Sequence, residues 1–173
     1  LDAIAGDVPK TTILLAEKCL DEATIDQSLL RQIRTEHTDR KPLYINFTSG
    51  STGLPKGVAV SHRAVMDFIR IYADTFAITK EDIIGNQAPF DFDVSVKDIY
   101  TGLLTGAKVQ IIPREYFSDP TTLMDYMADS KMTVLTWAVS AMCFVSVMNG
   151  FGYRTPATVQ KVLFSGEVLP IKH

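Results

Sequence analysis

A dense group of hydroxyl, glycine and lysine side chains directly follows the apolar residues 43–47. The group consists of Thr48, Ser49, Gly50, Ser51, Thr52, Gly53 and Lys56. Glycine allows the backbone to turn so that several N–H groups face one anion, and the hydroxyls add further donors. A lysine brings a mobile positive charge that can neutralise a phosphate. We therefore expect this loop to bind a nucleotide polyphosphate. Because glycine rather than Ser or Thr follows the lysine, it is not a Walker A loop.

Strand and helix patterns alternate on the C-terminal side of this loop. Short apolar runs predict strands at residues 43–47, 58–60, from 83 onward, 108–112, 133–136 and 159–164. Helical spacing predicts helices over residues 95–104, 120–128 and 139–148. Another helix is expected after Ser61, with one apolar face formed by Val65, Ile69, Tyr72 and Phe76. Because such alternation requires crossover connections, we expect an α/β fold with a largely parallel sheet and helices on both faces.

Composition and charge limit the classes of protein to which this chain can belong. Of the 173 residues, 46% are hydrophobic and 21% are charged, which is ordinary for a globular domain and argues against disorder. The net charge of −3 gives no reason to expect a nucleic-acid partner. The longest apolar run, residues 137–145, is too short to cross a membrane and is expected to form a buried helix.

The cysteines and histidines suggest no metal or disulfide chemistry. Cys19 and Cys143 lie far apart, and the apolar neighbours of Cys143 predict a buried free thiol, which fits a reducing cytoplasm. The histidines, His37, His62 and His173, follow no metal-ligand spacing. We therefore expect no metal-binding residues in this chain, a cytoplasmic location and no membrane partner.

Residues 48–57 read Thr-Ser-Gly-Ser-Thr-Gly-Leu-Pro-Lys-Gly and resemble the signature loop of the AMP-forming adenylating enzymes. That superfamily includes acyl-CoA synthetases, luciferases and the adenylation domains of non-ribosomal peptide synthetases. The resemblance implies that ATP and Mg²⁺ are the cofactors and that the loop binds the phosphates. It also implies a catalytic role for Lys56 and Thr48. In relatives, the carboxylate that binds Mg²⁺ lies in a half of the domain that this sequence does not contain.

Residues 92–95 resemble the Phe-Asp-x-Ser motif of amino-acid-activating adenylation domains. In those enzymes the aspartate pairs with the α-ammonium group of the substrate, a task that suits an ionised carboxylate. The residues that match substrate-binding positions are Asp93, Val94, Lys97, Thr136, Trp137 and Ser165. Gly166 and Glu167 match positions beside the adenine. D-alanine–carrier-protein ligases and stand-alone amino acid adenylation domains are the members that the sequence resembles most.

The resemblance also implies a reaction and a domain organisation. A carboxylate of an amino acid or related substrate attacks the α-phosphate of ATP. The acyl-adenylate then passes to a thiol, often the phosphopantetheine arm of a carrier protein. Residues 43–173 would form the ATP- and substrate-binding part, and residues 1–42 the leading segment of an incomplete domain. Because the family's ribose-binding aspartate and C-terminal catalytic lysine do not occur, we expect a fragment that is inactive alone.

Other interpretations stay open at this point. Asp93 could cap the helix at residues 95–104, since aspartate is a common cap, and the enzyme would then be an acyl- or aryl-CoA synthetase. The loop could also belong to a non-enzymatic module that binds a nucleotide or a protein. Lys97 occupies a position that is usually apolar or aromatic in relatives. It could neutralise an acidic substrate, or it could reach solvent or pair with Asp98 or Glu115.

Overall fold

The computed structural model describes residues 25–48 and 53–170 of the chain. Two units divide the chain, with their boundary between Thr38 and Asp39. In the first unit the described element is helix α3 (Gln27–Glu36). None of the helices within the described ranges combines the length and the apolar character that crossing a membrane requires.

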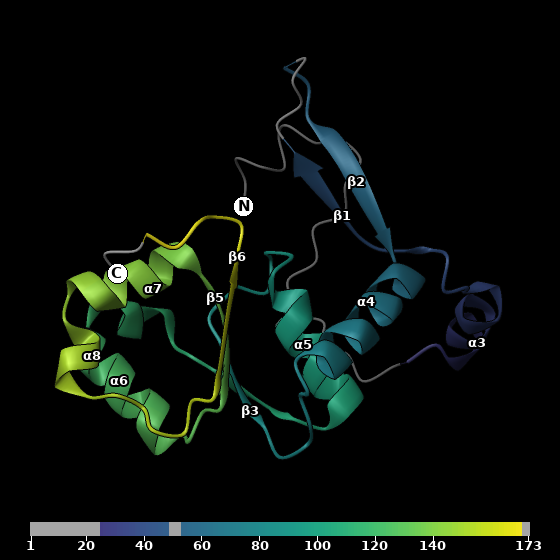
Figure 1. Ribbon diagram of the computed structural model, residues 1–173. Helices are drawn as coiled ribbons and strands as arrows, with labels where there is room; N and C mark the ends of the chain where they lie inside the picture. Colours follow the sequence, from purple (N-terminus) through teal and green to yellow (C-terminus); the bar gives the residue numbers. More distant parts are fainter. Residues whose placement is uncertain (1–24, 49–52, 171–173) are drawn as a thin grey trace. The chain divides into compact units, whose positions relative to one another are not determined.

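The second unit begins with an antiparallel hairpin. Strands β1 (Pro42–Thr48) and β2 (Lys56–Ser61) pair with each other, and Thr48 lies opposite Lys56 (Figure 1). Both strands predicted around the glycine-rich loop are therefore present, but they form a sheet of their own. The pairing places the two ends of the loop side by side.

The larger sheet contains four parallel strands in the order β4-β3-β5-β6. These are β3 (Ile83–Asn86), β4 (Lys108–Ile111), β5 (Val134–Ala138) and β6 (Lys161–Ser165). The predicted parallel sheet with crossover connections is thereby confirmed. Strand β6 begins later than predicted because the apolar Val159 belongs to a turn, in which its N–H donates to the Pro156 carbonyl at 3.1 Å.

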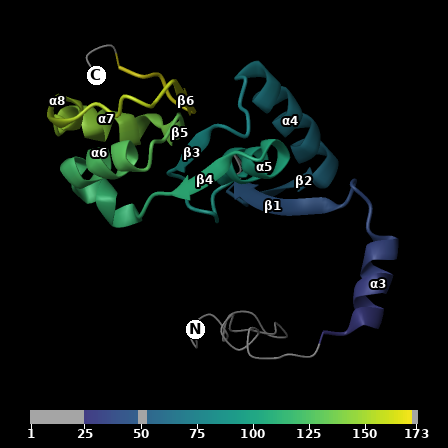
Figure 2. The same cartoon turned by 90° about the horizontal axis from the view of Figure 1, so that it is seen from below.

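Helices cover both faces of this sheet, as predicted (Figures 1 and 2). One face carries α4 (His62–Thr75) and α5 (Ser95–Thr105), which contact each other. The other face carries the 3-10 helix η1 (Arg114–Ser118), α6 (Pro120–Asp129), α7 (Val139–Val147) and α8 (Gly150–Tyr153). Cys143 on α7 is a free thiol that is only half-buried, which is less than predicted.

Helix α4 is the helix predicted after Ser61. The Ser61 hydroxyl caps it by accepting a backbone N–H of the first turn at 3.2 Å. Val65, Ile69 and Tyr72 are buried, as their spacing predicts. Phe76 lies one residue beyond the end of the helix and is 36% exposed, so it does not continue that face into the core.

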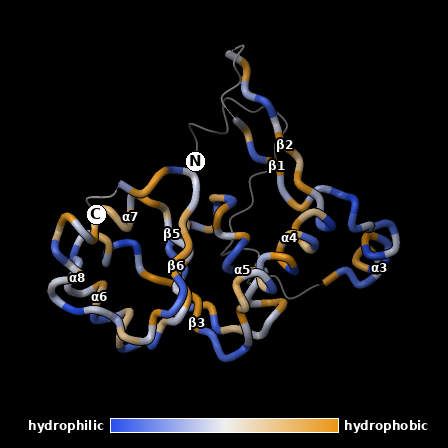
Figure 3. Tube along the Cα trace, viewed as in Figure 1, coloured by the Kyte–Doolittle hydropathy of each residue, from blue (hydrophilic) through white to orange (hydrophobic). Residues whose placement is uncertain are grey.

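Strand β5 lies between the two helical layers, and its side chains alternate between them. Val134 packs with Tyr72 of α4 on one side. Leu135 and Trp137 pack on the other side, with side chains of α6 and α7. Alternation of this kind follows from the two-residue period of a strand, and Figure 3 shows hydrophobic stretches along the central strands. Trp137, predicted to lie in a buried helix, instead belongs to this strand, and α7 begins at Val139.

The two ends of the parallel sheet differ in their chemistry. At the amino ends, the buried Asp82 pairs with Lys161 Nζ at 3.0 Å and accepts the Thr133 hydroxyl at 2.7 Å. At the carboxyl ends, the strands lead into connections that carry the predicted substrate residues. Open α/β sheets bind their ligands at the carboxyl ends of the strands, so this edge is the expected place for a site.

Candidate functional site

Connections that follow β3, β5 and β6 meet around a cavity of about 320 Å³ at the carboxyl edge of the sheet. Its lining includes residues predicted from the sequence, namely Val94, Thr136, Trp137, Ser165, Gly166 and Glu167. These residues lie far apart in the chain and come together because parallel strands end at the same edge. Gly166 has a φ of +94°, a conformation that favours glycine, so the turn after β6 depends on it.

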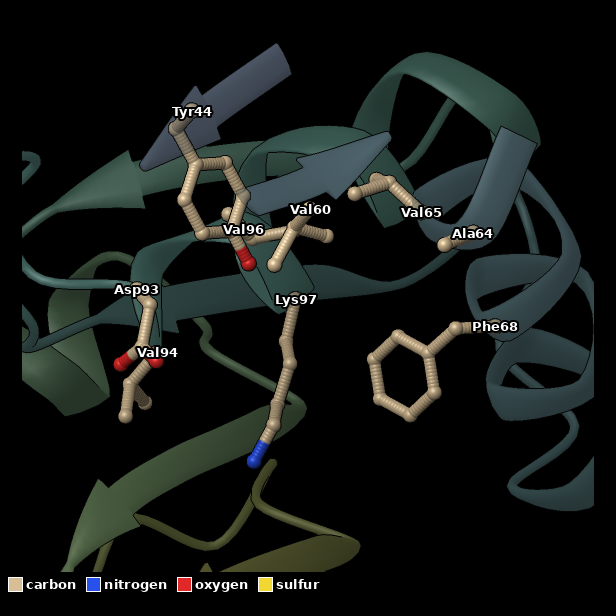
Figure 4. A pocket seen from close by; sticks show the side chains of 9 residues that line it. All are labelled: Tyr44, Val60, Ala64, Val65, Phe68, Asp93, Val94, Val96 and Lys97. Atoms are coloured by element: carbon tan, nitrogen blue, oxygen red, sulfur yellow. The ribbon is translucent and has the colours of Figure 1, made fainter. Parts of the chain in front are cut away.

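A second cavity, of about 280 Å³, lies between the hairpin, α4 and the start of α5 (Figure 4). It is lined by Tyr44, Val60, Ala64, Val65, Phe68, Asp93, Val94, Val96 and Lys97. We call it the Asp93 cavity. Its wall is mostly apolar and carries one carboxylate and one ammonium group. Because Val94 lines both cavities, the two adjoin at this residue.

The Asp93 side chain does not cap α5. Val94 precedes the helix, and the first turn has no side-chain cap hydrogen bond. Asp93 contributes to this turn through its backbone carbonyl, which accepts the N–H of Val96 at 3.1 Å. Burial raises the pKa of Tyr44, and the negative charge of the nearby Asp93 raises it further. The Asp93 residue is exposed beside the cavity, so a cationic group can reach its carboxylate.

Lys97 follows Asp93 by one helical turn, and its ammonium points toward β6 (Figure 4). The Nζ atom donates a hydrogen bond to Ser165 Oγ at 3.2 Å. Within the described part of the chain, neither Asp98 nor Glu115 forms an ion pair with it. Lys97 is half-buried as a residue, while the hydrogen bond of its ammonium to Ser165 lies at an exposed position.

Thr136 and Trp137 support the site from within the core. The Thr136 hydroxyl is 2.8 Å from the Tyr72 hydroxyl, and the Trp137 indole N–H donates to the Gly85 carbonyl at 3.1 Å. Trp137 is 2% exposed and stacks edge-on against Phe117 with ring centroids 5.2 Å apart. The polar groups of Thr136 and Trp137 therefore already form hydrogen bonds within the protein. Direct contact of these two residues with the substrate stays a prediction.

The described ends of the glycine-rich loop present donors at the loop end of the β1–β2 hairpin. Thr48 and Lys56 are both exposed, and the Thr48 hydroxyl approaches the Lys56 carbonyl at 3.5 Å. Gly53 has a φ of +82°, which favours glycine at this turn. The predicted residues Ser49, Gly50, Ser51 and Thr52 lie outside the described residues. The donor set fits phosphate oxygens in chemistry, and its role remains a prediction.

Sequence reasoning missed several residues of the site. Tyr44 and Phe68 form walls of the Asp93 cavity from β1 and α4, and only tertiary packing brings them there. Asp98 is buried on the face of α5 that also carries Ser95 and Thr101. The signal for this face was present in the sequence, because these polar residues recur at every third position along the helix.

Comparison with known proteins identifies the family. Residues 2–173 match the family described as AMP-binding enzyme. The chain is 32% identical to a D-alanine–D-alanyl carrier protein ligase of Bacillus cytotoxicus, over 85% of this chain and 31% of the ligase. It is 33% identical to an L-proline–[L-prolyl-carrier protein] ligase of Pseudomonas fluorescens, over 75% of this chain and 26% of that ligase. The chain therefore spans about a third or less of these relatives.

Solved structures agree with this result. A nonribosomal peptide synthetase, FmoA3, in its AMPPNP-bound form superposes with a TM-score of 0.66 at 26% identity, covering 78% of this chain and 14% of the synthetase. The N-terminal domain of FACL13 from Mycobacterium tuberculosis superposes with a TM-score of 0.69 over 84% of this chain and 38% of that domain. Its identity of 19% supports the fold alone. The chain belongs to the family of AMP-binding enzymes.

Proposed function

We propose that this chain is the nucleotide- and substrate-binding part of an enzyme that adenylates an amino acid and transfers it to a carrier-protein thiol. The observation that carries the proposal is the Asp93 carboxylate, which is not used as a helix cap and lines a mostly apolar cavity. An acyl or aryl acid offers no cation to such a carboxylate, whereas an amino acid offers its α-ammonium group. The carrier-protein ligases and peptide synthetase among the relatives support the same class.

In this proposal, one residue binds the substrate and the others bind the nucleotide. Asp93 would accept charge-assisted hydrogen bonds from the α-ammonium group and so orient the substrate carboxylate. When bound, ATP supplies the adenylyl group that activates this carboxylate, with pyrophosphate as the leaving group. Thr48 and Lys56 would donate to the polyphosphate and stabilise the charge that grows on the departing pyrophosphate. Gly166 and Glu167, after β6, would lie beside the adenine.

Magnesium is expected with the nucleotide because a bare triphosphate repels itself strongly. Among the described residues, no group of histidine, cysteine, aspartate and glutamate side chains could hold a metal ion. We therefore assign no step of the reaction to a metal bound by this chain. Ser49, Gly50, Ser51 and Thr52 are proposed as phosphate donors on the sequence pattern alone.

Lys97 favours a particular substrate class. Asp93, just before α5, and Lys97, in its first turn, place opposite charges on the lining of one cavity. An amino acid with an acidic side chain would satisfy both charges, its ammonium at Asp93 and its side-chain carboxylate at Lys97. The Ser165 hydroxyl, which accepts from Lys97, would hold the ammonium in this direction.

Pyrophosphate exchange by the full-length enzyme tests the proposal. The enzyme is incubated with ATP, labelled pyrophosphate and a panel of amino acids, each paired with its des-amino analogue. We expect exchange that depends on an amino acid and is much weaker with the analogue. Exchange supported equally well by fatty or aryl acids would indicate a CoA synthetase. A complete lack of exchange with every acid would indicate a binding module.

A further inference from the structure

Asp98 is a buried carboxylate next to the candidate site. It lies in the first turn of α5 and is 1% exposed. Asp82, the other buried carboxylate in the described ranges, is neutralised by Lys161 at the opposite edge of the sheet. No such ion pair forms at Asp98 within the described part of the chain. Burying a carboxylate without a salt bridge is costly unless hydrogen bonds compensate, so the partners of Asp98 matter.

Polar side chains from three other elements lie around it. Asn86, at the end of β3, donates its side-chain amide to Asp98 Oδ2 at 2.9 Å. Thr136 of β5 acts to lower the pKa of the same carboxyl group, and its hydroxyl is 2.8 Å from that of Tyr72 on α4. A carboxylate only accepts hydrogen bonds, so the Asn86 amide directs an N–H group at Asp98. Together these side chains form a buried polar network that joins β3, β5, α4 and α5.

The same network leads to the substrate residues. The Asn86 amide that binds Asp98 also donates to the Ala88 carbonyl at 3.2 Å, at the start of the connection that carries Asp93. Lys97 is the neighbour of Asp98 in the first turn of α5. Asp98 is not among the described residues that line the Asp93 cavity. It can therefore influence a ligand there without lining the cavity itself, through the residues that it holds.

We infer that Asp98 is a positioning residue, which fixes residues 87–94 and the first turn of α5 and so aims Asp93 and Lys97 at the substrate. The part that concerns substrate rests on the proposed function. The part that concerns the connection stands on the hydrogen bonds that Asn86 donates to Asp98 and to the Ala88 carbonyl. In line with these contacts, burial raises the pKa of Asp98 to about 6, while Asn86, Lys97 and Thr136 act to lower it. Asp98 is thus mostly ionised at neutral pH and accepts these bonds as a carboxylate.

Variants of the full-length enzyme separate positioning from general stability. Asp98→Ala removes the network, and Asp98→Asn keeps the size and one acceptor. Asp82→Ala is the matched control, because it also removes a buried carboxylate but at the amino edge of the sheet. We expect Asp98→Ala to raise the amino-acid KM or lower kcat by roughly tenfold to a hundredfold, since small misplacements of reacting groups are costly. The KM for ATP should stay within about twofold, with Asp98→Asn intermediate.

Amide hydrogen exchange gives a readout that does not need activity. Asp98→Ala should speed exchange in peptides that cover residues 87–96 and leave α6 unchanged, whereas Asp82→Ala should leave residues 87–96 unchanged. Unaltered exchange there in Asp98→Ala, or equal rises in the KM for ATP and for the amino acid, would overturn the inference. If the wild-type enzyme activates no amino acid, the proposed function fails. The exchange experiment then still decides whether Asp98 holds this connection.

Discussion

At the scale of single residues, Asp93 is the residue that we propose distinguishes amino acids from their des-amino analogues. Asp93→Asn keeps the size of the side chain but removes its negative charge. We expect the kcat/KM for amino acids to fall by roughly tenfold or more, because a charge-assisted hydrogen bond is lost. The des-amino analogues should lose little. Pyrophosphate exchange measures both, and Asp91→Asn, an exposed carboxylate that does not line the Asp93 cavity, serves as the control. Equal loss for both substrate types would contradict the assignment.

Lys97 is the residue on which the proposed preference for an amino acid with an acidic side chain rests. Lys97→Met removes the ammonium and keeps an apolar side chain of similar length, so it should shift the preference from acidic toward neutral amino acids. Lys97→Arg retains the charge and should retain the preference in part, since the guanidinium cannot reproduce the same hydrogen bond to Ser165. The ratio of kcat/KM for acidic and neutral substrates is the measurement. An unchanged ratio in Lys97→Met would show that this lysine forms its hydrogen bond to Ser165 but does not select the substrate.

Lys56 should act on the nucleotide and not on the fold. It is exposed at the start of β2, so Lys56→Ala should leave the melting temperature nearly unchanged. Loss of its charge from the phosphates should raise the KM for ATP by roughly tenfold or more. Lys41→Ala changes an exposed lysine just before β1 and provides the control. Unfolding of Lys56→Ala, or an unchanged KM for ATP, would remove Lys56 from the nucleotide site.

The residues that the sequence could predict are those inside continuous motifs. Asp93 follows from the Phe-Asp-x-Ser pattern, and Lys97 stands out nearby as a departure from relatives; both residues line one cavity. Tyr44 reaches that cavity from another strand, so no local pattern could predict it. The orientation of Trp137 could not be predicted either, because the side of the sheet that it faces depends on the register of β5 against its neighbours.

At the scale of elements, the pair of Asp82 and Lys161 links the start of β3 to the start of β6. Burial acts to raise the pKa of Asp82, but hydrogen bonds from the Thr79 N–H, Thr133 and Lys161 outweigh it and leave the pKa below its ordinary value of 3.8. The unfolded chain therefore binds a proton at higher pH than the folded chain. The resulting stabilisation is present above about pH 4 and is lost as the pH falls through the lowered pKa.

Lys161→Met tests this link. At pH 7 it should lower the free energy of unfolding by about 2 kcal/mol, because it leaves a buried carboxylate without its cation. The difference from wild type should shrink below about pH 4, where Asp82 becomes protonated. Urea unfolding at several pH values measures it. Lys108→Met, at the exposed first position of β4, is the matched control and should cost little at any pH.

The alternation of strands and helices was predictable because crossover connections leave few topologies for a parallel sheet. The antiparallel pairing of β1 and β2 was not predicted from their sequences, since each also fits an inner strand of the parallel sheet. Their separation from the larger sheet matters for function. It leaves Tyr44 and Val60 facing the start of α5 across the Asp93 cavity instead of being covered by a neighbouring strand.

At the scale of the whole molecule, the chain corresponds to only part of the enzymes that it resembles. It spans 31% and 26% of two curated carrier-protein ligases. Its described residues include no cluster that could hold a metal ion. The cavities at the carboxyl edge are lined from β1, β2, α4 and α5 and from the connections after β3, β5 and β6. We therefore propose that this chain contributes to binding of the substrate, and we expect stabilisation of the transition state to need further groups.

The 173-residue chain by itself should therefore not catalyse amino-acid-dependent pyrophosphate exchange at a rate near that of the full-length enzyme. Losing one transition-state donor costs roughly a hundredfold or more, and losses of several groups combine. The same preparation should still give a folded circular-dichroism spectrum, because both helical layers pack on the sheet within this chain. Exchange is measured on equal molar amounts of the chain and the full-length enzyme, with the same amino acid. Comparable rates would mean that the groups needed for adenylation all lie within these 173 residues.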